Sequence, residues 1–161
     1  MRTTQRALKL AHFLGLCLFL GSIVSFIVIS TLAEGAGMSQ LAFGRRVISA
    51  GTRAMTLPGM WLLAASGLAL GLQRYGWRSG FFRLKAGLML AILLNAHGFV
   101  MPAVSEATEL AQQAAQTGQL SAAYAQAYGR ETICGALNIM LCLAAAATGV
   151  WRPRPLEAGK D

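Results

Sequence analysis

Four long apolar runs divide this chain, and they constrain its fold more than any other feature of the sequence. They cover residues 10–32, 55–72, 84–104 and 133–151. A helix needs about 20 consecutive apolar residues to cross a bilayer, and each run has close to that length. We therefore predict an all-α, polytopic membrane protein. It should form a single integral membrane domain over residues 1–161, folded as an up-down-up-down bundle of four transmembrane helices.

The composition supports the membrane assignment. Hydrophobic residues make up 55% of the chain and charged residues only 12%, whereas soluble domains carry about 25% charged residues. In a soluble protein, 14 Lys and Arg against 6 Asp and Glu would suggest nucleic-acid binding. Here the basic residues stand in short segments between the apolar runs. We therefore predict the lipid bilayer as the partner and no binding of nucleic acid.

The distribution of basic residues predicts the orientation. One side of the predicted membrane carries ten of them: Arg2, Arg6, Lys9, Arg74, Arg78, Arg83, Lys85, Arg152, Arg154 and Lys160. The other side carries four: Arg45, Arg46, Arg53 and Arg130. Cytoplasmic segments have an excess of Lys and Arg, so we expect both termini in the cytoplasm and the bundle in a bacterial inner membrane. The first run could also be a secretory signal peptide, but its apolar core exceeds the roughly 7–15 residues of a signal peptide, which favours an uncleaved span.

Both connections on the far side of the membrane are expected to be helical. The segment 38–54 continues into the second span, where Pro58 should kink the helix. The segment 105–132 is rich in Ala and Gln, which favour helices, and Thr117 with Gly118 forms the expected turn within it. These two extensions would carry the bundle a few turns beyond the membrane surface.

The two histidines, His12 and His97, lie inside predicted spans and are the main candidates for a site. Neutral imidazole is a common axial ligand of haem iron, so both are candidate ligands of haem b. At 1.5 Å per residue their depths in the membrane differ by about 10–15 Å, which favours single-histidine sites over one haem held by both. The alternative is that each histidine only forms a hydrogen bond between helices.

Met101 follows His97 at i+4, so the sequence places an imidazole and a thioether on one helix face. This pair suits a His/Met haem or a soft metal such as Cu(I), although methionine also serves as ordinary packing. If His97 is a ligand, its ring should face the bundle interior and a cavity lined by small residues. Arg53 and Arg130 are candidate partners for haem propionates. The alternative is that they reach lipid headgroups.

Small residues recur at helical spacing near His12. Gly15, Ser22 and Ser25 share a face of the first span, and Gly67 and Gly71 share a face of the second. Such residues let a helix or a flat cofactor approach closely, and tight helix packing is the favoured interpretation. The sequence contains no nucleotide-binding loop, zinc signature or serine nucleophile motif, and its 3 cysteines show no ligand spacing.

Several stretches resemble a broad group of small four-helix bacterial membrane proteins. They are "RALKLAHFLGLCLFLGSIVSF", "GRRVISAGTRAMTLPGMWLLAASGLALGL", "LKAGLMLAILLNAHG" and the closing "WRP". The group includes the HemJ-type protoporphyrinogen oxidases and the CopD copper-resistance membrane domain, and the chain is most similar to its uncharacterised branch. The resemblance to the HemJ type implies haem b binding, with His12, Trp77, Lys85 and His97 at the family's histidine, tryptophan, lysine and histidine positions. The chain lacks the family's arginine after the first span and the Asn-Glu pair that opens the fourth.

Three functional hypotheses follow from the sequence. The first is a haem b protein that acts in electron transfer or porphyrin oxidation, with His97 and His12 as metal ligands and Met101 and Arg53 beside the cofactor. The second is a non-catalytic membrane protein or accessory subunit whose histidines are structural. The third is a copper-handling membrane protein. A redox partner or a homo-oligomer is compatible with each, and no catalytic residue is predicted.

Overall fold

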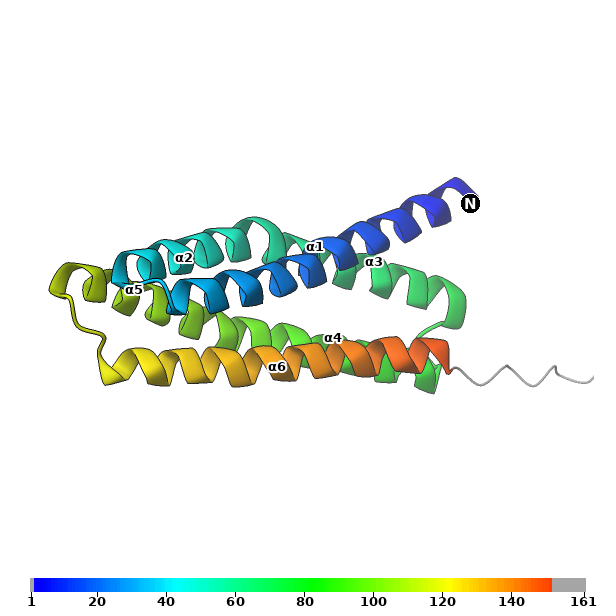
Figure 1. Ribbon diagram of the computed structural model, residues 1–161. Coiled ribbons are helices and arrows are strands. Elements are labelled where there is room, and N and C mark those ends of the chain that lie inside the picture. The colour runs from blue at the N-terminus through cyan, green and yellow to red at the C-terminus, as the bar shows by residue number, and fades with distance from the viewer. Residues whose placement is uncertain (1, 152–161) are drawn as a thin grey trace, which may run out of the picture.

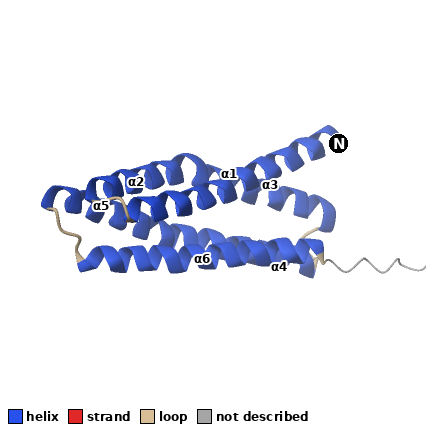
Figure 2. Cartoon of the chain, in the orientation of Figure 1, coloured by secondary structure: helices blue, strands red, loops and turns tan. Residues whose placement is uncertain are grey.

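The computed structural model describes residues 2–151, and every regular element within them is helical (Figure 1, Figure 2). The α-helices are α1 (Arg2–Glu34), α2 (Met38–Gly51), α3 (Leu57–Tyr75), α4 (Gly80–Asn95), α5 (Met101–Thr117) and α6 (Ala122–Val150). Two π-helical segments, η1 (Thr52–Thr56) and η2 (Ala96–Val100), join α2 to α3 and α4 to α5 without a break. Arg152, Arg154 and Lys160, three of the ten basic residues that predict the cytoplasmic side, lie outside the described residues.

The described helices form four continuous rods. They are α1, the α2-η1-α3 rod over Met38–Tyr75, the α4-η2-α5 rod over Gly80–Thr117, and α6. Each rod is long and apolar enough to cross a membrane, so the predicted fold class, an all-α multi-pass bundle of four helices, is confirmed. The turns at 35–37 and 118–121 lie at one end, which we call the two-turn end (Figure 1). The turn at 76–79 lies at the other end, which we call the terminal end, together with the start of α1 and the end of α6.

A proline follows each π-helical segment. Pro58 is the second residue of α3, and Pro102 is the second residue of α5. Proline has no N–H, and its ring clashes with the carbonyl four residues earlier, so the regular hydrogen-bond ladder cannot pass through it. A wider π-helical turn before each proline accommodates this clash. The irregularity at Pro58 agrees with the predicted kink, whereas the one at Pro102 was not predicted.

Glycines bring α1 and α3 into close contact. A Cβ atom built on Gly15 would lie 2.6 Å from the backbone nitrogen of Leu63, and one built on Gly59 would lie 2.8 Å from the backbone nitrogen of Phe19. Only glycine therefore allows the two backbones to approach this closely. Gly15 and the buried Ser22 thus serve helix packing, which is the interpretation that the sequence favoured, whereas Ser25 is exposed.

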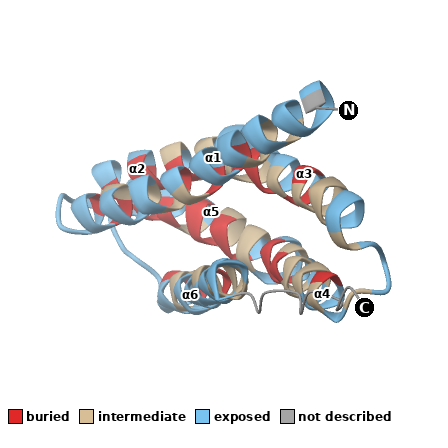
Figure 3. Cartoon of the chain, turned by 90° about the vertical axis from the view of Figure 1, so that its right-hand side faces the viewer, coloured by how far each residue is buried: buried red, intermediate tan, exposed pale blue. Residues whose placement is uncertain are grey.

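At the two-turn end, α2, α5 and α6 pack through alanines. Ala107, Ala111 and Ala127 are 0% exposed, and they cluster with Leu41 and Tyr124. Their methyl groups let the three helices approach closely, as small residues do between membrane helices. Figure 3 shows this buried surface on α2 and α5, while most of α6 remains exposed to the surroundings of the bundle.

The connection from α5 to α6 is the predicted helical hairpin. Gly118 ends α5 with a φ of 74°, and its N–H donates to the carbonyl of Ala114 at 2.8 Å. Glycine adopts this left-handed conformation without a steric cost, which is why it often ends a helix. Ser121 then caps α6 by accepting a hydrogen bond from the N–H of Tyr124 at 3.4 Å. The structure of residues 105–132 thus agrees with the sequence prediction.

Candidate functional site

The bundle is open on the side where α1 faces α6. A closed bundle of four antiparallel helices brings its first and last helices into contact. Here no Cα atom of α1 lies within 8 Å of a Cα atom of α6, although α1 contacts α2 and α3 while α6 contacts α4 and α5. Figure 3 shows α6 standing apart from α1. A cavity of about 310 Å³ lies between these two helices, and we call it the lateral groove.

Apolar side chains form most of the lateral groove. Its walls include Phe19, Ile23 and Phe26 of α1 and Gly135, Ala136 and Ile139 of α6. Its floor includes residues of both π-helical segments: Thr52 and Thr56 of η1, and Ala96 and Val100 of η2. Single π-helical turns occur frequently at functional sites. Their position under the same cavity marks the lateral groove as the candidate functional site.

A buried ion pair closes the lateral groove at the two-turn end. The guanidinium of Arg45 on α2 donates hydrogen bonds to both carboxylate oxygens of Glu131 on α6, one of them at 3.2 Å. The side chain of Arg45 is 0% exposed and that of Glu131 is 17% exposed. A fully buried guanidinium needs such a partner because it cannot lose its charge. The sequence pattern places Arg45 among the basic residues beside the membrane and does not predict this pair.

Two tyrosines pack beside the ion pair. The Tyr128 ring centroid lies 6.0 Å from the guanidinium carbon of Arg45, and it stacks on the Tyr124 ring with centroids 6.0 Å apart. Both tyrosines precede the fourth apolar run. Within the described residues, the Tyr124 hydroxyl and Nε of Arg45 have no hydrogen-bond partner. Tyr128 and Glu131 line the lateral groove, whereas Arg45 and Tyr124 do not.

A second buried polar contact holds α6 against α4. The side-chain amide of Asn95 donates to Oδ1 of Asn138 and to the backbone carbonyl of Cys134, both at 2.8 Å. Asn95 and Asn138 are both buried, and Asn138 also lines the lateral groove. Such hydrogen bonds between membrane helices are worth about 0.6–2 kcal/mol. This contact fixes α6 on α4, on the side away from α1.

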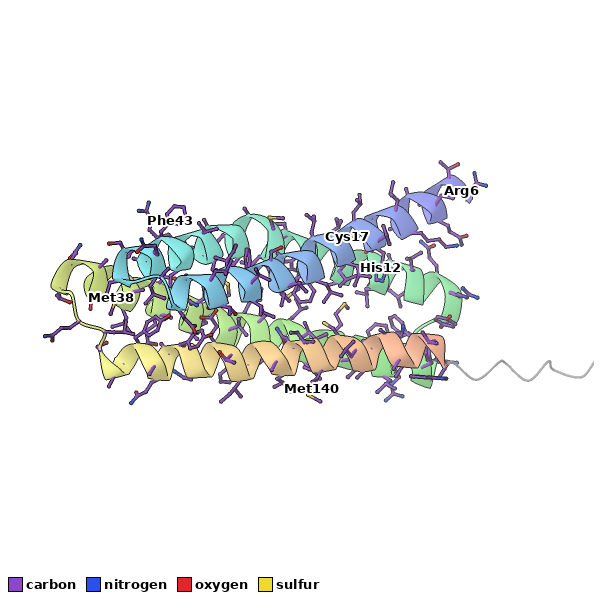
Figure 4. The ribbon with its side chains drawn as sticks, viewed as in Figure 1. Arg6, His12, Cys17, Met38, Phe43 and Met140 are labelled. Carbon is purple, nitrogen blue, oxygen red and sulfur yellow. The ribbon has the colours of Figure 1, made fainter. Side chains whose placement is uncertain are left out.

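His12 lies between α1 and α3, as Figure 4 shows. Its Nδ1 is 3.2 Å from the backbone oxygen of Leu63 and 3.2 Å from Oγ of Ser66. Gly67 leaves room for the ring, because a Cβ atom there would lie 3.0 Å from Cε1 of His12. A carbonyl oxygen only accepts hydrogen bonds, so Nδ1 carries the proton and Nε2 keeps the lone pair. The contact has the form of the predicted hydrogen bond between helices.

His97 does not face the bundle interior. It lies in η2, its side chain is exposed, and its ring centroid is 5.8 Å from that of Trp61 on α3. Met101 lines the lateral groove, whereas His97 does not. The structure therefore separates the two side chains that the i,i+4 spacing places in one space.

The predicted haem residues do not come together at one site. His12 lies at the α1–α3 contact, His97 lies on the surface of η2, Arg53 is exposed on η1, and Arg130 forms an exposed ion pair with Glu106 at 2.6 Å. In the described part of the chain, no three His, Cys, Asp or Glu side chains gather as a metal-binding group. A haem held by both histidines does not fit this arrangement. Nδ1 of His12 contacts a carbonyl oxygen, as the second ring nitrogen of a metal-binding histidine commonly does, but His12 does not line the lateral groove.

No known protein family, curated protein or solved structure matches this chain. The resemblance to the HemJ/CopD-like group therefore stays a prediction from the sequence. The function has to be inferred from the geometry of the lateral groove and of the two histidines.

Proposed function

We propose that this membrane protein binds an amphiphile from the bilayer in the lateral groove. The observation that carries the proposal is a cavity of about 310 Å³ between two helices that do not contact each other. A concave, mostly apolar site with a few polar groups is the usual form of a site for a small molecule. The hydrocarbon chain would lie between Ile23 and Ile139, and the polar head beside Tyr128 and Glu131.

The membrane environment supports an occupied groove. In water, the hydrophobic effect would press α1 and α6 together, whereas lipid tails are as apolar as the side chains that line the groove. The apolar walls therefore have no driving force to close on themselves. A hydrocarbon chain fills the groove in the bilayer, and the polar groups at the two-turn end select which amphiphile supplies it.

We also propose that the bundle lies in a bacterial inner membrane with both termini in the cytoplasm. The support is the sequence count of ten basic residues on one side against four on the other. In this orientation the two-turn end is periplasmic. The polar end of the lateral groove then opens near the outer surface of the membrane.

Labelling with a photoreactive fatty alcohol tests the proposed binding. The purified protein in lipid nanodiscs should be labelled saturably by diazirine-bearing dodecanol, with competition by dodecanol. Gly135 lines the groove, and no atom lies within 4 Å of a Cβ built there, so Gly135→Trp should fill the groove and abolish saturable labelling. Gly21 has the same open space but does not line the groove, and Gly21→Trp should label like the wild type. Equal saturable labelling of both variants would overturn the proposal.

The orientation of His12 favours a second candidate function, the binding of a b-type haem. Histidines that bind a metal almost always donate their other ring N–H to a carboxylate, a carbonyl or water, and Nδ1 of His12 lies 3.2 Å from the Leu63 carbonyl. His12 would hold the haem through Nε2, while His97, Met101 and Arg53 take no part. The haem would supply one-electron chemistry, in electron transfer or porphyrin oxidation.

An absorption spectrum separates haem binding from a structural histidine. After haem supplementation, the wild type and the His97→Ala variant should show a Soret band, and the His12→Ala variant should not. A colourless wild type overturns haem binding. In that case His12 only forms a hydrogen bond between helices, which contributes about 0.6–2 kcal/mol to stability. The protein is then a non-catalytic or accessory membrane subunit. Metal analysis of the same sample tests copper handling, which loses support because His97 and Met101 do not share a space.

A further inference from the structure

The polar end of the lateral groove presents a carboxylate rather than a basic group. Glu131 lines the groove and is 17% exposed, whereas Arg45 is 0% exposed and does not line it. None of the residues that line the groove is a lysine or an arginine. A headgroup in the groove therefore meets the carboxylate of Glu131 before it meets the guanidinium behind it.

A second carboxylate stands next to this end. Glu34 is the last residue of α1 and is exposed, and Ser30, which lines the groove, donates a hydrogen bond to its Oε1 at 3.4 Å. Tyr128 of α6 lines the same end of the groove. Among the described residues, no lysine or arginine forms an ion pair with Glu34. The mouth of the groove thus carries a negative charge without an ionic partner.

The other described basic side chains near the two-turn end are engaged or lie elsewhere. Arg130 pairs with Glu106 at 2.6 Å. Arg46 lines a separate hollow between α2 and α5, together with Phe43 and Gln112. Neither residue lines the lateral groove, so neither offsets the carboxylates at its polar end.

We infer that the lateral groove takes an alkylammonium amphiphile, a hydrocarbon chain with an amine or quaternary ammonium head. The inference rests on the proposed function of the groove. The chain would lie against the apolar walls, and the cationic head would lie beside Glu34. The carboxylate of Glu34 has no ion pair in the described part of the chain, whereas that of Glu131 is already paired with Arg45. Heads that carry sulfate, phosphate or carboxylate without an ammonium group would instead meet like charge, which disfavours them. The ammonium head can come from an ethanolamine lipid or from a free lipophilic cation.

Competition between heads on one chain length tests the inference. The protein in phosphatidylglycerol nanodiscs binds diazirine-bearing dodecanol. Dodecyltrimethylammonium, dodecanol or dodecyl sulfate is then added to displace this probe. In wild type, the ammonium compound should displace the probe at the lowest concentration, below that of dodecanol. The ratio of the dodecanol concentration to the ammonium concentration should fall about five-fold in Glu34→Gln, since a partly exposed ion pair is worth up to about 1 kcal/mol. Displacement by dodecanol should stay the same. Wild type and variant share one bilayer, so partitioning into the lipid cancels.

Glu109→Gln is the matched control, because Glu109 is an exposed glutamate of α5 that does not line the groove. It should behave like the wild type with all three competitors. Absence of saturable labelling overturns the proposed function itself. Saturable labelling that the three heads displace equally, or that Glu34→Gln does not change, overturns only the ammonium inference.

Changing the bilayer identifies the source of the head. Replacing half of the phosphatidylglycerol with phosphatidylethanolamine should reduce labelling of the wild type if the lipid supplies the ammonium, and Glu34→Gln should restore it. Labelling that does not respond to phosphatidylethanolamine, with displacement by dodecyltrimethylammonium intact, assigns the groove to free lipophilic cations.

Discussion

Replacing Arg45 and Glu131 with methionine, singly and together, tests the buried ion pair that closes the groove. Glu131→Met leaves a guanidinium that is 0% exposed and cannot lose its charge, so we expect a loss of about 4–5 kcal/mol in the free energy of unfolding. Arg45→Met leaves a carboxylate that is 17% exposed and so keeps some contact with its surroundings, and the expected loss is about 3 kcal/mol. The double variant has no buried charge and should be more stable than either single variant.

The free energies are measured by reversible unfolding of the protein in bicelles, and the four proteins form a double-mutant cycle. Arg130 and Glu106 supply a matched control, because their ion pair is 58% and 43% exposed. Methionine at either control position should cost about 1 kcal/mol or less. If the effects at Arg45 and Glu131 add, so that the double variant is the least stable of the four proteins, the two side chains are not a buried pair.

Two further predictions concern helix packing and topology. Gly59→Leu should cost about 1–3 kcal/mol and lower the melting temperature, because its Cβ alone would lie 2.8 Å from the backbone nitrogen of Phe19. Gly21→Leu enters open space and should leave the melting temperature unchanged, so equal effects would contradict the α1–α3 crossing. Reporter fusions after Gln73 and after Gly118 should report the cytoplasm and the periplasm, respectively, from the excess of basic residues on the terminal side. The reverse pattern would overturn the orientation.

The four helices and the α5–α6 hairpin could be predicted because they depend on local chemistry. Inside a bilayer, only a helix or a closed barrel of strands satisfies the hydrogen bonds of the backbone. Apolar runs of about 20 residues are too long for barrel strands, so they form helices. Gly118 follows an Ala-rich segment and ends it in the left-handed conformation, which is the usual role of glycine there. The close approach at Gly15 likewise follows from a missing side chain on an otherwise apolar helix face.

The lateral groove and the ion pair could not be predicted because they depend on how distant segments meet. Arg45 and Glu131 are 86 residues apart in the sequence, and an arginine near a membrane surface usually interacts with lipid headgroups. The separation of α1 from α6 depends on the angles between helices, which hydropathy does not encode. His97 is exposed while Met101 lines the groove, and the i,i+4 spacing does not encode which part of that helix face turns toward the interior.

Mapping the labelled residues shows whether an amphiphile occupies the lateral groove. The protein in nanodiscs is illuminated with diazirine-bearing dodecanol, and the labelled residues are identified by peptide mass spectrometry with and without excess dodecanol. We expect competed labelling at Ile23, Val100 and Ile139, which line the groove. We expect only uncompeted background at Phe13 and Leu143, which are 62% and 63% exposed but lie outside the groove. Equal labelling of both sets, with no competition at the groove residues, would contradict an amphiphile in the groove.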